Sequence, residues 1–271
     1  MLGRILIAIV GTVAALFGVC WLGLRVPAPA FPSDESAGTA TTNIPIPTGL
    51  PAPVERFARV VYGDMLPQAQ MARVSGHATV TMNGITMPAR FRFSYDMARG
   101  HYHEIQVTWF ALPVMSIHER YLDGHAILDI PIIGRVENDP NTDAASRQGF
   151  WAELLAWVPA LAIGDPRVRW QAIDDTSARM YVPGADDADA FTLHFDPATG
   201  YMTELRAMRY SDSEQRRRWQ PSALKWDDLH GTPTMVRSSI HWDDDAPWVM
   251  WDVEDVVLGA NVSARLERFG G

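Results

Sequence analysis

Residues 74–95, Val-Ser-Gly-His-Ala-Thr-Val-Thr-Met-Asn-Gly-Ile-Thr-Met-Pro-Ala-Arg-Phe-Arg-Phe-Ser-Tyr, decide the fold class of this chain. Apolar or small residues alternate with polar ones over residues 74–82, which is the period of a strand with one buried face. Asn83-Gly84 follows, and this pair between alternating runs is a strong signal of a tight hairpin. Three aromatic residues of the return segment share one face: Phe91, Phe93 and Tyr95. The stretch therefore predicts two antiparallel strands with an aromatic inner face.

The same alternation recurs along most of the chain. Further strands are predicted at residues 101–110, 167–173, 178–182, 190–195, 201–210, 223–228, 235–242, 249–256 and 262–266. Asp123-Gly124 and Pro183-Gly184 lie between such runs, and these residue types favour tight turns. Consecutive strands joined by short turns form an antiparallel meander rather than a parallel α/β sheet.

Two helices are predicted within this β pattern. The first covers residues 53–63, and the second covers residues 144–161, where Trp151 and Leu154 belong to an apolar repeat at helical spacing. A curved sheet of about ten strands must close on itself or have its inner face covered. The sequence therefore predicts a mainly β (α+β) fold, a large antiparallel open or half-closed β-barrel with helices covering its concave face.

An uncharged apolar run lies between Arg4 and Arg25. About 20 such residues form a helix about 30 Å long, enough to cross a bilayer. We expect a transmembrane anchor at residues 5–25 and a cytoplasmic N-terminus at residues 1–4, because a long domain after a first anchor is usually translocated. The alternative is a cleaved signal peptide with a cleavage site at Ala28-Pro29-Ala30.

A Pro-rich linker is expected at residues 26–52, since its Pro, Ala, Ser, Thr and Gly residues cannot build a core. Residues 53–271 are then expected to form one extracytoplasmic domain. The single cysteine, Cys20, lies in the apolar run, so the domain has no thiol to oxidise, which is compatible with export. We expect a single-pass membrane protein with most of the chain in the periplasm or at the cell surface.

The composition excludes some classes of function. The net charge of −9 disfavours nucleic-acid binding. The sequence contains no Gly-x-Ser-x-Gly, no His-Glu-x-x-His and no phosphate-binding glycine loop. These absences favour a binding protein over an enzyme, and no motif indicates a cofactor or an oligomeric state.

Aromatic residues at alternating strand positions suggest a ligand site. In a half-barrel the core and a ligand cavity share the same surface. The residues expected to line an apolar cavity are Phe91, Phe93, Tyr95, Trp109, Trp170, Phe191 and Phe195. A lipid or a lipoprotein acyl chain would fit such a cavity.

His101 and His103 lie two residues apart in a predicted strand, so both side chains point to one face. This spacing occurs among zinc ligands. Candidates for a third ligand are His118, His125 and His241. The alternative is a pair of solvated histidines at a strand end, and Glu104 is expected on the opposite face.

Charged clusters give weaker signals. The basic run consists of Arg216, Arg217, Arg218 and Trp219, and it suits either contact with anionic headgroups or a solvated hairpin tip. Asp243–Asp245 and Asp186–Asp189 suit either calcium binding or plain acidic turns.

Several short motifs resemble, in order, those of a family of uncharacterised bacterial domains. They are Pro-Ala-Pro-Val-Glu-Arg-Phe at 51–57, Arg-Tyr-Leu-Asp-Gly at 120–124, Trp-Val-Pro-Ala at 157–160, the segment 168–178, and Phe195-Asp196 with Gly200 and Tyr210. The resemblance implies a shape similar to the LolA-like lipoprotein-carrier half-barrel, which would hold a hydrophobic ligand. It implies no catalytic residues.

The sequence thus favours a membrane-tethered extracytoplasmic domain that binds or shields a lipid or acyl chain. Two alternatives stay open. One is a metal-dependent hydrolase that uses His101 and His103, and the other is a structural or interaction module of an envelope complex.

Overall fold

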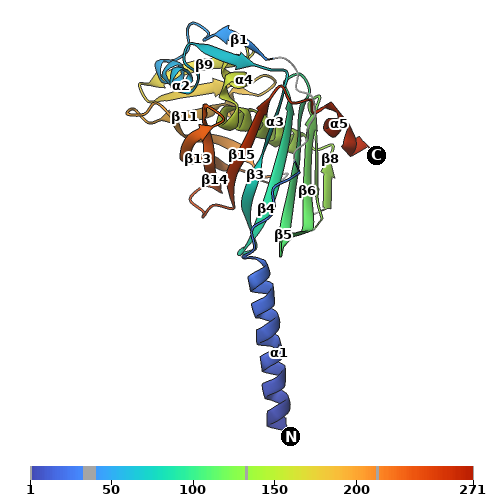
Figure 1. Ribbon diagram of the computed structural model, residues 1–271. Coiled ribbons are helices and arrows are strands. Elements are labelled where there is room, and N and C mark those ends of the chain that lie inside the picture. The colour runs from blue at the N-terminus through green and yellow to red at the C-terminus, as the bar shows by residue number, and fades with distance from the viewer. Residues whose placement is uncertain (1, 33–40, 132–133, 212–213, 271) are drawn as a thin grey trace.

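The computed structural model describes residues 2–32, 41–131, 134–211 and 214–270, so residues 33–40 of the expected linker lie outside the described part. Within those ranges, thirteen strands form one antiparallel sheet that is not closed, with β8 and β9 at its edges (Figure 1). One half contains β3 (Met71–Met82), β4 (Ile85–Asp96), β5 (Gly100–Trp109), β6 (Leu112–Leu122), β7 (His125–Ile130) and β8 (Gly134–Glu137). The other half contains β9 (Arg169–Asp174), β10 (Ser177–Tyr181), β11 (Phe191–Phe195), β12 (Met202–Tyr210), β13 (Arg216–Leu229), β14 (Thr232–Trp242) and β15 (Val249–Leu258). The predicted open antiparallel fold is confirmed.

The two halves meet where β15 pairs with β3. Gly76 of β3 lies opposite Val253, beside a register shift of β15 between Val253 and Asp255. A Cβ atom on Gly76 would lie 2.1 Å from the carbonyl oxygen of Asp252. Glycine therefore lets the irregular part of β15 approach β3 closely.

Three helices lie against the curved sheet: α2 (Ala52–Tyr62), α3 (Pro140–Trp157) and α4 (Pro159–Ile163). The prediction of α2 is confirmed. Helix α3 begins earlier than expected because the Asp139 carboxylate accepts hydrogen bonds from the backbone N–H groups of Asn141 and Thr142. Pro159 has no N–H to donate, so the helix breaks there and α4 begins.

The core lies between the sheet and these helices. The ring of Trp157 on α3 stacks on Phe91 with 5.9 Å between ring centroids, and it lies 5.7 Å from the ring of Phe93. Trp251 of β15 packs edge-on against the Trp157 ring. Helix α3 contacts β5, β6 and β7 of one half and β12 and β14 of the other, so it fills the concave face.

The N-terminal helix α1 (Leu2–Gly23) extends away from the sheet (Figure 1). Its segment Gly3–Gly23 is long and apolar enough to cross a membrane, with a mean hydropathy of 2.5 and no buried residue in its most apolar stretch of 18. The chain then runs onto the convex face of the sheet, where the Arg92 guanidinium lies 4.4 Å from the ring centroid of Phe31.

The folded part begins before the expected boundary at Pro53. Strand β1 (Thr42–Pro45) pairs with β2 (Met65–Gln68), and Ile44 packs against the core.

The strand predicted at residues 262–266 is wrong. The chain leaves the sheet at Gly259, whose φ is +75°, and residues Ser263–Leu266 form helix α5, followed by a short 3₁₀ helix η2 (Glu267–Gly270). The Asn261 side chain accepts a hydrogen bond from the Ser263 N–H, which favours the helical turn. A further 3₁₀ turn, η1 (Asp187–Asp189), lies before β11.

Candidate functional sites

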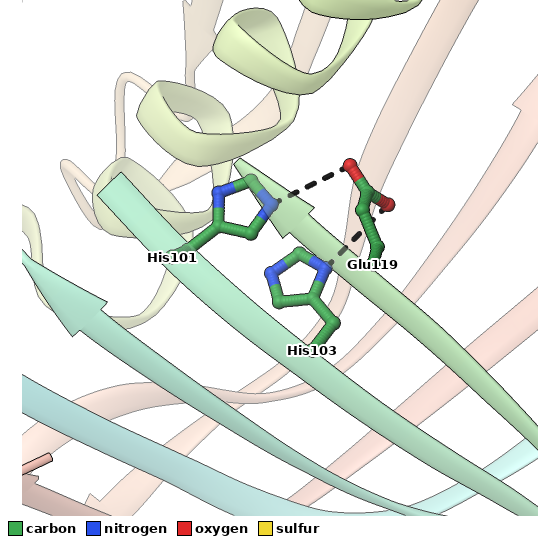
Figure 2. Close-up of side chains that lie close together, drawn as sticks. All are labelled: His101, His103 and Glu119. Carbon is green, nitrogen blue, oxygen red and sulfur yellow. Dashed lines mark ion pairs between the residues drawn. The ribbon is translucent and has the colours of Figure 1, made fainter. Parts of the chain in front are cut away.

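His101 and His103 lie on β5 and point toward the concave face beneath α3 (Figure 2). Their exposed fractions are 0% and 4%, so the expectation of solvated histidines at a strand end is wrong. The two rings stack with 3.9 Å between their centroids. The period of two does bring both imidazoles to one face, and the helix covers that face.

Glu119 of β6 is the third member of the cluster, and the sequence analysis missed it. It lies opposite His103 in the register of β5 and β6. One carboxylate oxygen is 3.4 Å from Nε2 of His101, and the other is 3.7 Å from Nδ1 of His103 (Figure 2). One possible ligand atom from each residue lies within 4.8 Å of the other two.

The histidines considered as third ligands lie elsewhere. His118 is opposite Glu104 on the other face of the sheet, and its Nδ1 atom lies 2.8 Å from the Tyr102 hydroxyl oxygen. The His125 side chain is 83% exposed. His241 lies on β14, opposite Gln220 of β13. None of the three faces the cluster. Glu104, expected on the opposite face, forms an ion pair with Arg92 there.

A second carboxylate supports the cluster from α3. An oxygen of Glu153 lies 2.8 Å from Nε2 of His103 and accepts a hydrogen bond of 3.0 Å from the Tyr95 hydroxyl. Ser146, also on α3, donates a hydrogen bond of 2.6 Å to Glu119. Polar side chains of the helix thus orient both the histidine and the carboxylate of the sheet.

The electrostatics of the cluster follow from burial and charge. Burial and the neighbouring His103 lower the pKa of His101. Burial opposes protonation of His103 as well, but Glu153 and Glu119 outweigh it and raise the pKa of His103 to about 9. Burial also opposes ionisation of Glu119, yet the two histidines hold the pKa of Glu119 well below its usual range. Protonated His103 and the Glu119 carboxylate therefore form a buried pair of opposite charge.

Most of the aromatic residues expected to line a cavity lie in the packed core. Fully or almost fully buried are Phe91, Phe93, Tyr95, Phe191 and Phe195, and Trp170 is partly buried against the same core. Trp109 does not belong to this set, because its Nε1 atom donates a hydrogen bond to the Cys20 carbonyl oxygen of α1. In this structure α3 and α4 occupy the concave face, and ligand binding there stays a prediction.

The basic run begins strand β13 rather than forming a hairpin tip. Arg217 forms ion pairs with Asp243 and Asp245, and Arg218 pairs with Asp244. Arg216 pairs with the buried Asp189 at 2.7 Å, while Trp219 is 2% exposed. The two opposite-charge clusters thus offset one another, which weakens the field that either could exert on a lipid or a calcium ion.

A second candidate site lies where α1 meets the sheet. The backbone N–H of Phe110, at the β5–β6 turn, donates a hydrogen bond of 3.0 Å to the Gly23 carbonyl oxygen. Large apolar side chains at the tips of the β3–β4 and β5–β6 hairpins are exposed; they are Ile85, Phe110, Leu112 and Val114. The tips point toward α1 (Figure 1).

Beside this junction lies a groove of about 920 Å³ between α1 and strands β3 and β4. Apolar lining residues come from the helix and the segment after it, namely Phe17, Cys20, Trp21, Leu24, Pro27 and Ala28. Thr79, Thr86 and Pro88 line the sheet side, and Arg25, His77 and Asp252 add polar groups. The groove therefore combines an apolar wall with charged residues.

Several solved structures are similar to this chain. The chain is similar to a DUF1329 family protein from Desulfovibrio piger, with 9% identity, a TM-score of 0.45, and coverage of 80% of this chain and 95% of the other. It is also similar to a LolA superfamily protein from Nitrosomonas europaea, with 11% identity, a TM-score of 0.45, and coverage of 78% and 94%. No curated protein matches the sequence.

A sequence family also matches most of the chain. Residues 41–253 match the family of unknown function DUF6544. The resemblance to an uncharacterised family is confirmed, and the chain belongs to DUF6544.

Proposed function

We propose that this protein is a membrane-tethered extracytoplasmic domain that holds the acyl chain of a membrane lipid. The groove of about 920 Å³ between α1 and the sheet carries this proposal. It opens beside a helix that is long and apolar enough to span a bilayer, so a lipid could enter it without crossing water.

The position of α1 in the bilayer determines where the groove lies relative to the membrane surface. With α1 in the bilayer and residues 26–271 outside, the C-terminal end of α1 lies in the outer interface. The Phe110 N–H and the Trp109 indole both donate hydrogen bonds to carbonyl oxygens of α1, of Gly23 and Cys20. These bonds keep the hairpin tips at that level, where exposed apolar residues and Trp are favourable.

The groove chemistry suits an amphipathic ligand. The Arg25 guanidinium lies 4.6 Å from the centroid of the Trp21 ring at one side of the groove. An acyl chain would lie along the apolar wall of α1, and a phosphate headgroup would lie near Arg25. Burial of each methylene would contribute about 0.8 kcal/mol.

The test is native mass spectrometry of the full chain released from membranes in mild detergent. We expect a bound phospholipid, and we expect Thr86→Trp, which fills the groove from the exposed end of β4, to remove most of it. Thr203→Trp, on an exposed position of β12 outside the groove, is the matched control and should keep the lipid. Absence of lipid from the wild type, or equal lipid in all three proteins, would overturn the proposal.

The tether itself has a separate test. A C-terminal alkaline phosphatase fusion should be active in cells, because we place residues 26–271 outside the cytoplasm. An inactive phosphatase fusion, together with fluorescence from a separate C-terminal fusion to green fluorescent protein, would indicate the opposite orientation. Release of the domain from washed membranes at alkaline pH would indicate a cleaved signal instead.

A further inference from the structure

We propose that His101, His103 and Glu119 bind one divalent transition-metal ion of the zinc class. The site is on the opposite face of the sheet from the proposed lipid groove and does not depend on it. It would join β5 to β6 beneath helix α3.

The spacing of the donor atoms is close to that of a metal site. Zinc bonds of about 2.0–2.2 Å in tetrahedral geometry place ligand atoms about 3.3 Å apart. The distance from His101 Nε2 to Glu119 is 3.4 Å, and the distance from His103 Nδ1 to Glu119 is 3.7 Å. The donor atoms, one from each residue, lie within 4.8 Å of one another, so small side-chain rotations would close the set.

The surroundings have the form of a supported metal site. A metal-bound histidine usually donates its other ring N–H to a carboxylate, which fixes the tautomer. Glu153 lies 2.8 Å from Nε2 of His103, on the side of the ring away from Glu119. In the metal-bound form this carboxylate would accept the proton of Nε2 and leave the Nδ1 lone pair to the ion. Ser146 restrains the Glu119 carboxylate in the same way with its hydrogen bond of 2.6 Å.

The charge of the cluster is compatible with a bound cation. Glu119 of β6 and Glu153 of α3 face each other across the cluster, and Arg209 is the cation of β12 that interacts with both. With both imidazoles neutral, as metal binding requires, these three charged groups carry one net negative charge. A divalent ion offsets it, and so would a proton on His103, which is the rival explanation.

The donor types favour zinc over calcium or magnesium. Two imidazoles and one carboxylate suit zinc and its neighbours in the transition series, whereas calcium and magnesium prefer oxygen ligands. Within the described residues the cluster is covered by α3, and both histidines are less than 5% exposed. Three protein donors leave the fourth tetrahedral position of zinc to a water molecule, since structural zinc usually has four protein ligands.

The experiment uses the full chain in detergent, stripped with chelator and titrated with Zn²⁺ by calorimetry, with the metal content measured by plasma mass spectrometry. We expect one zinc ion per chain. His101→Gln and Glu119→Gln should each weaken binding at least about tenfold, and Glu153→Gln should weaken it by about 10–100-fold through the loss of ligand orientation. Circular dichroism monitors the fold of each variant.

His118→Gln is the matched control, since His118 lies on β6 beside Glu119 but faces the other side of the sheet. It should bind zinc as the wild type does. Co²⁺ substitution of the wild type should give visible absorption bands, which requires no variant to fold. A wild type without zinc and without a Co²⁺ spectrum would leave only the protonated His103 and overturn the proposal. Equal loss of zinc in His118→Gln would overturn it as well.

Discussion

The Nε2 atom of His103 lies 2.8 Å from a carboxylate oxygen of Glu153, and this contact joins strand β5 to helix α3. The Tyr95 hydroxyl donates to the same oxygen from β4. Helix α3 is thus held on the concave face of the sheet by a buried polar contact as well as by the packing of its apolar side chains.

Replacing Glu153 should therefore loosen the helix. We expect Glu153→Ala to lower the free energy of unfolding by about 3–5 kcal/mol, because it leaves a buried histidine without its partner. Glu137→Ala, at a half-exposed edge-strand position, should change stability by less than about 0.5 kcal/mol. Urea unfolding of chelator-treated protein, followed by circular dichroism, measures both. Similar values for the two variants would mean that the contact contributes nothing.

The cap of α3 predicts a pH dependence. Hydrogen bonds from Thr142 lower the pKa of Asp139, so the folded state favours the ionised carboxylate. The resulting stability is present above the ordinary pKa of about 3.9 and is lost as pH falls through the depressed value. Asp139→Asn keeps an uncharged cap and should remove this part of the acid sensitivity. Parallel unfolding curves from pH 2 to pH 7 compare the two, and an identical acid slope would contradict the assignment.

The hairpin tips should be shielded by the bilayer. Leu112 is 65% exposed at the β5–β6 tip, and Leu224 is 51% exposed on β13. In a Cys20→Ser background, Leu112→Cys should react with a membrane-impermeant maleimide several-fold more slowly than Leu224→Cys in proteoliposomes. Both should react at similar rates in detergent with a membrane-permeant reagent. Equal rates in the bilayer would place the tips in water.

The junction of the two half-sheets should tolerate no side chain at Gly76. A methyl group there meets the backbone of β15, so Gly76→Ala should lower stability by about 1–3 kcal/mol or more. Ser75→Ala, next to it on the opposite face, is the control and should have a much smaller effect. Thermal unfolding of the two variants decides the matter, and a neutral Gly76→Ala would show that β15 can shift.

The sequence predicts most of the fold because its signals are local. Alternation, Asn83-Gly84 and Asp123-Gly124 mark strands and hairpins that the structure contains. The pairing of β15 with β3 connects residues about 180 positions apart, and no local signal specifies it. The same limit applies to β1, whose place beside β2 depends on pairing across helix α2.

The sequence predicts the two histidines of the candidate site but not Glu119, and a β-bulge explains why Glu119 is missed. Near the turn, Thr108 pairs with Pro113. If this register continued without a break, His118 would lie opposite His103. A register shift between Val107 and Thr108 brings Glu119 there instead. A one-residue shift moves every side chain to the other face, so the third member could not be found by counting. Glu153 could not be predicted for another reason, because its partner His103 lies 50 residues away in the sequence.

The place of β15 between the two halves has a consequence for biosynthesis. The strands from β3 to β8 leave the ribosome first, yet the edge of β3 has no partner until residues 249–258 are made. Until then this edge is an open template for pairing with other chains. An N-terminal helix that holds each nascent chain at the membrane would keep neighbouring copies apart while the last strand is delivered.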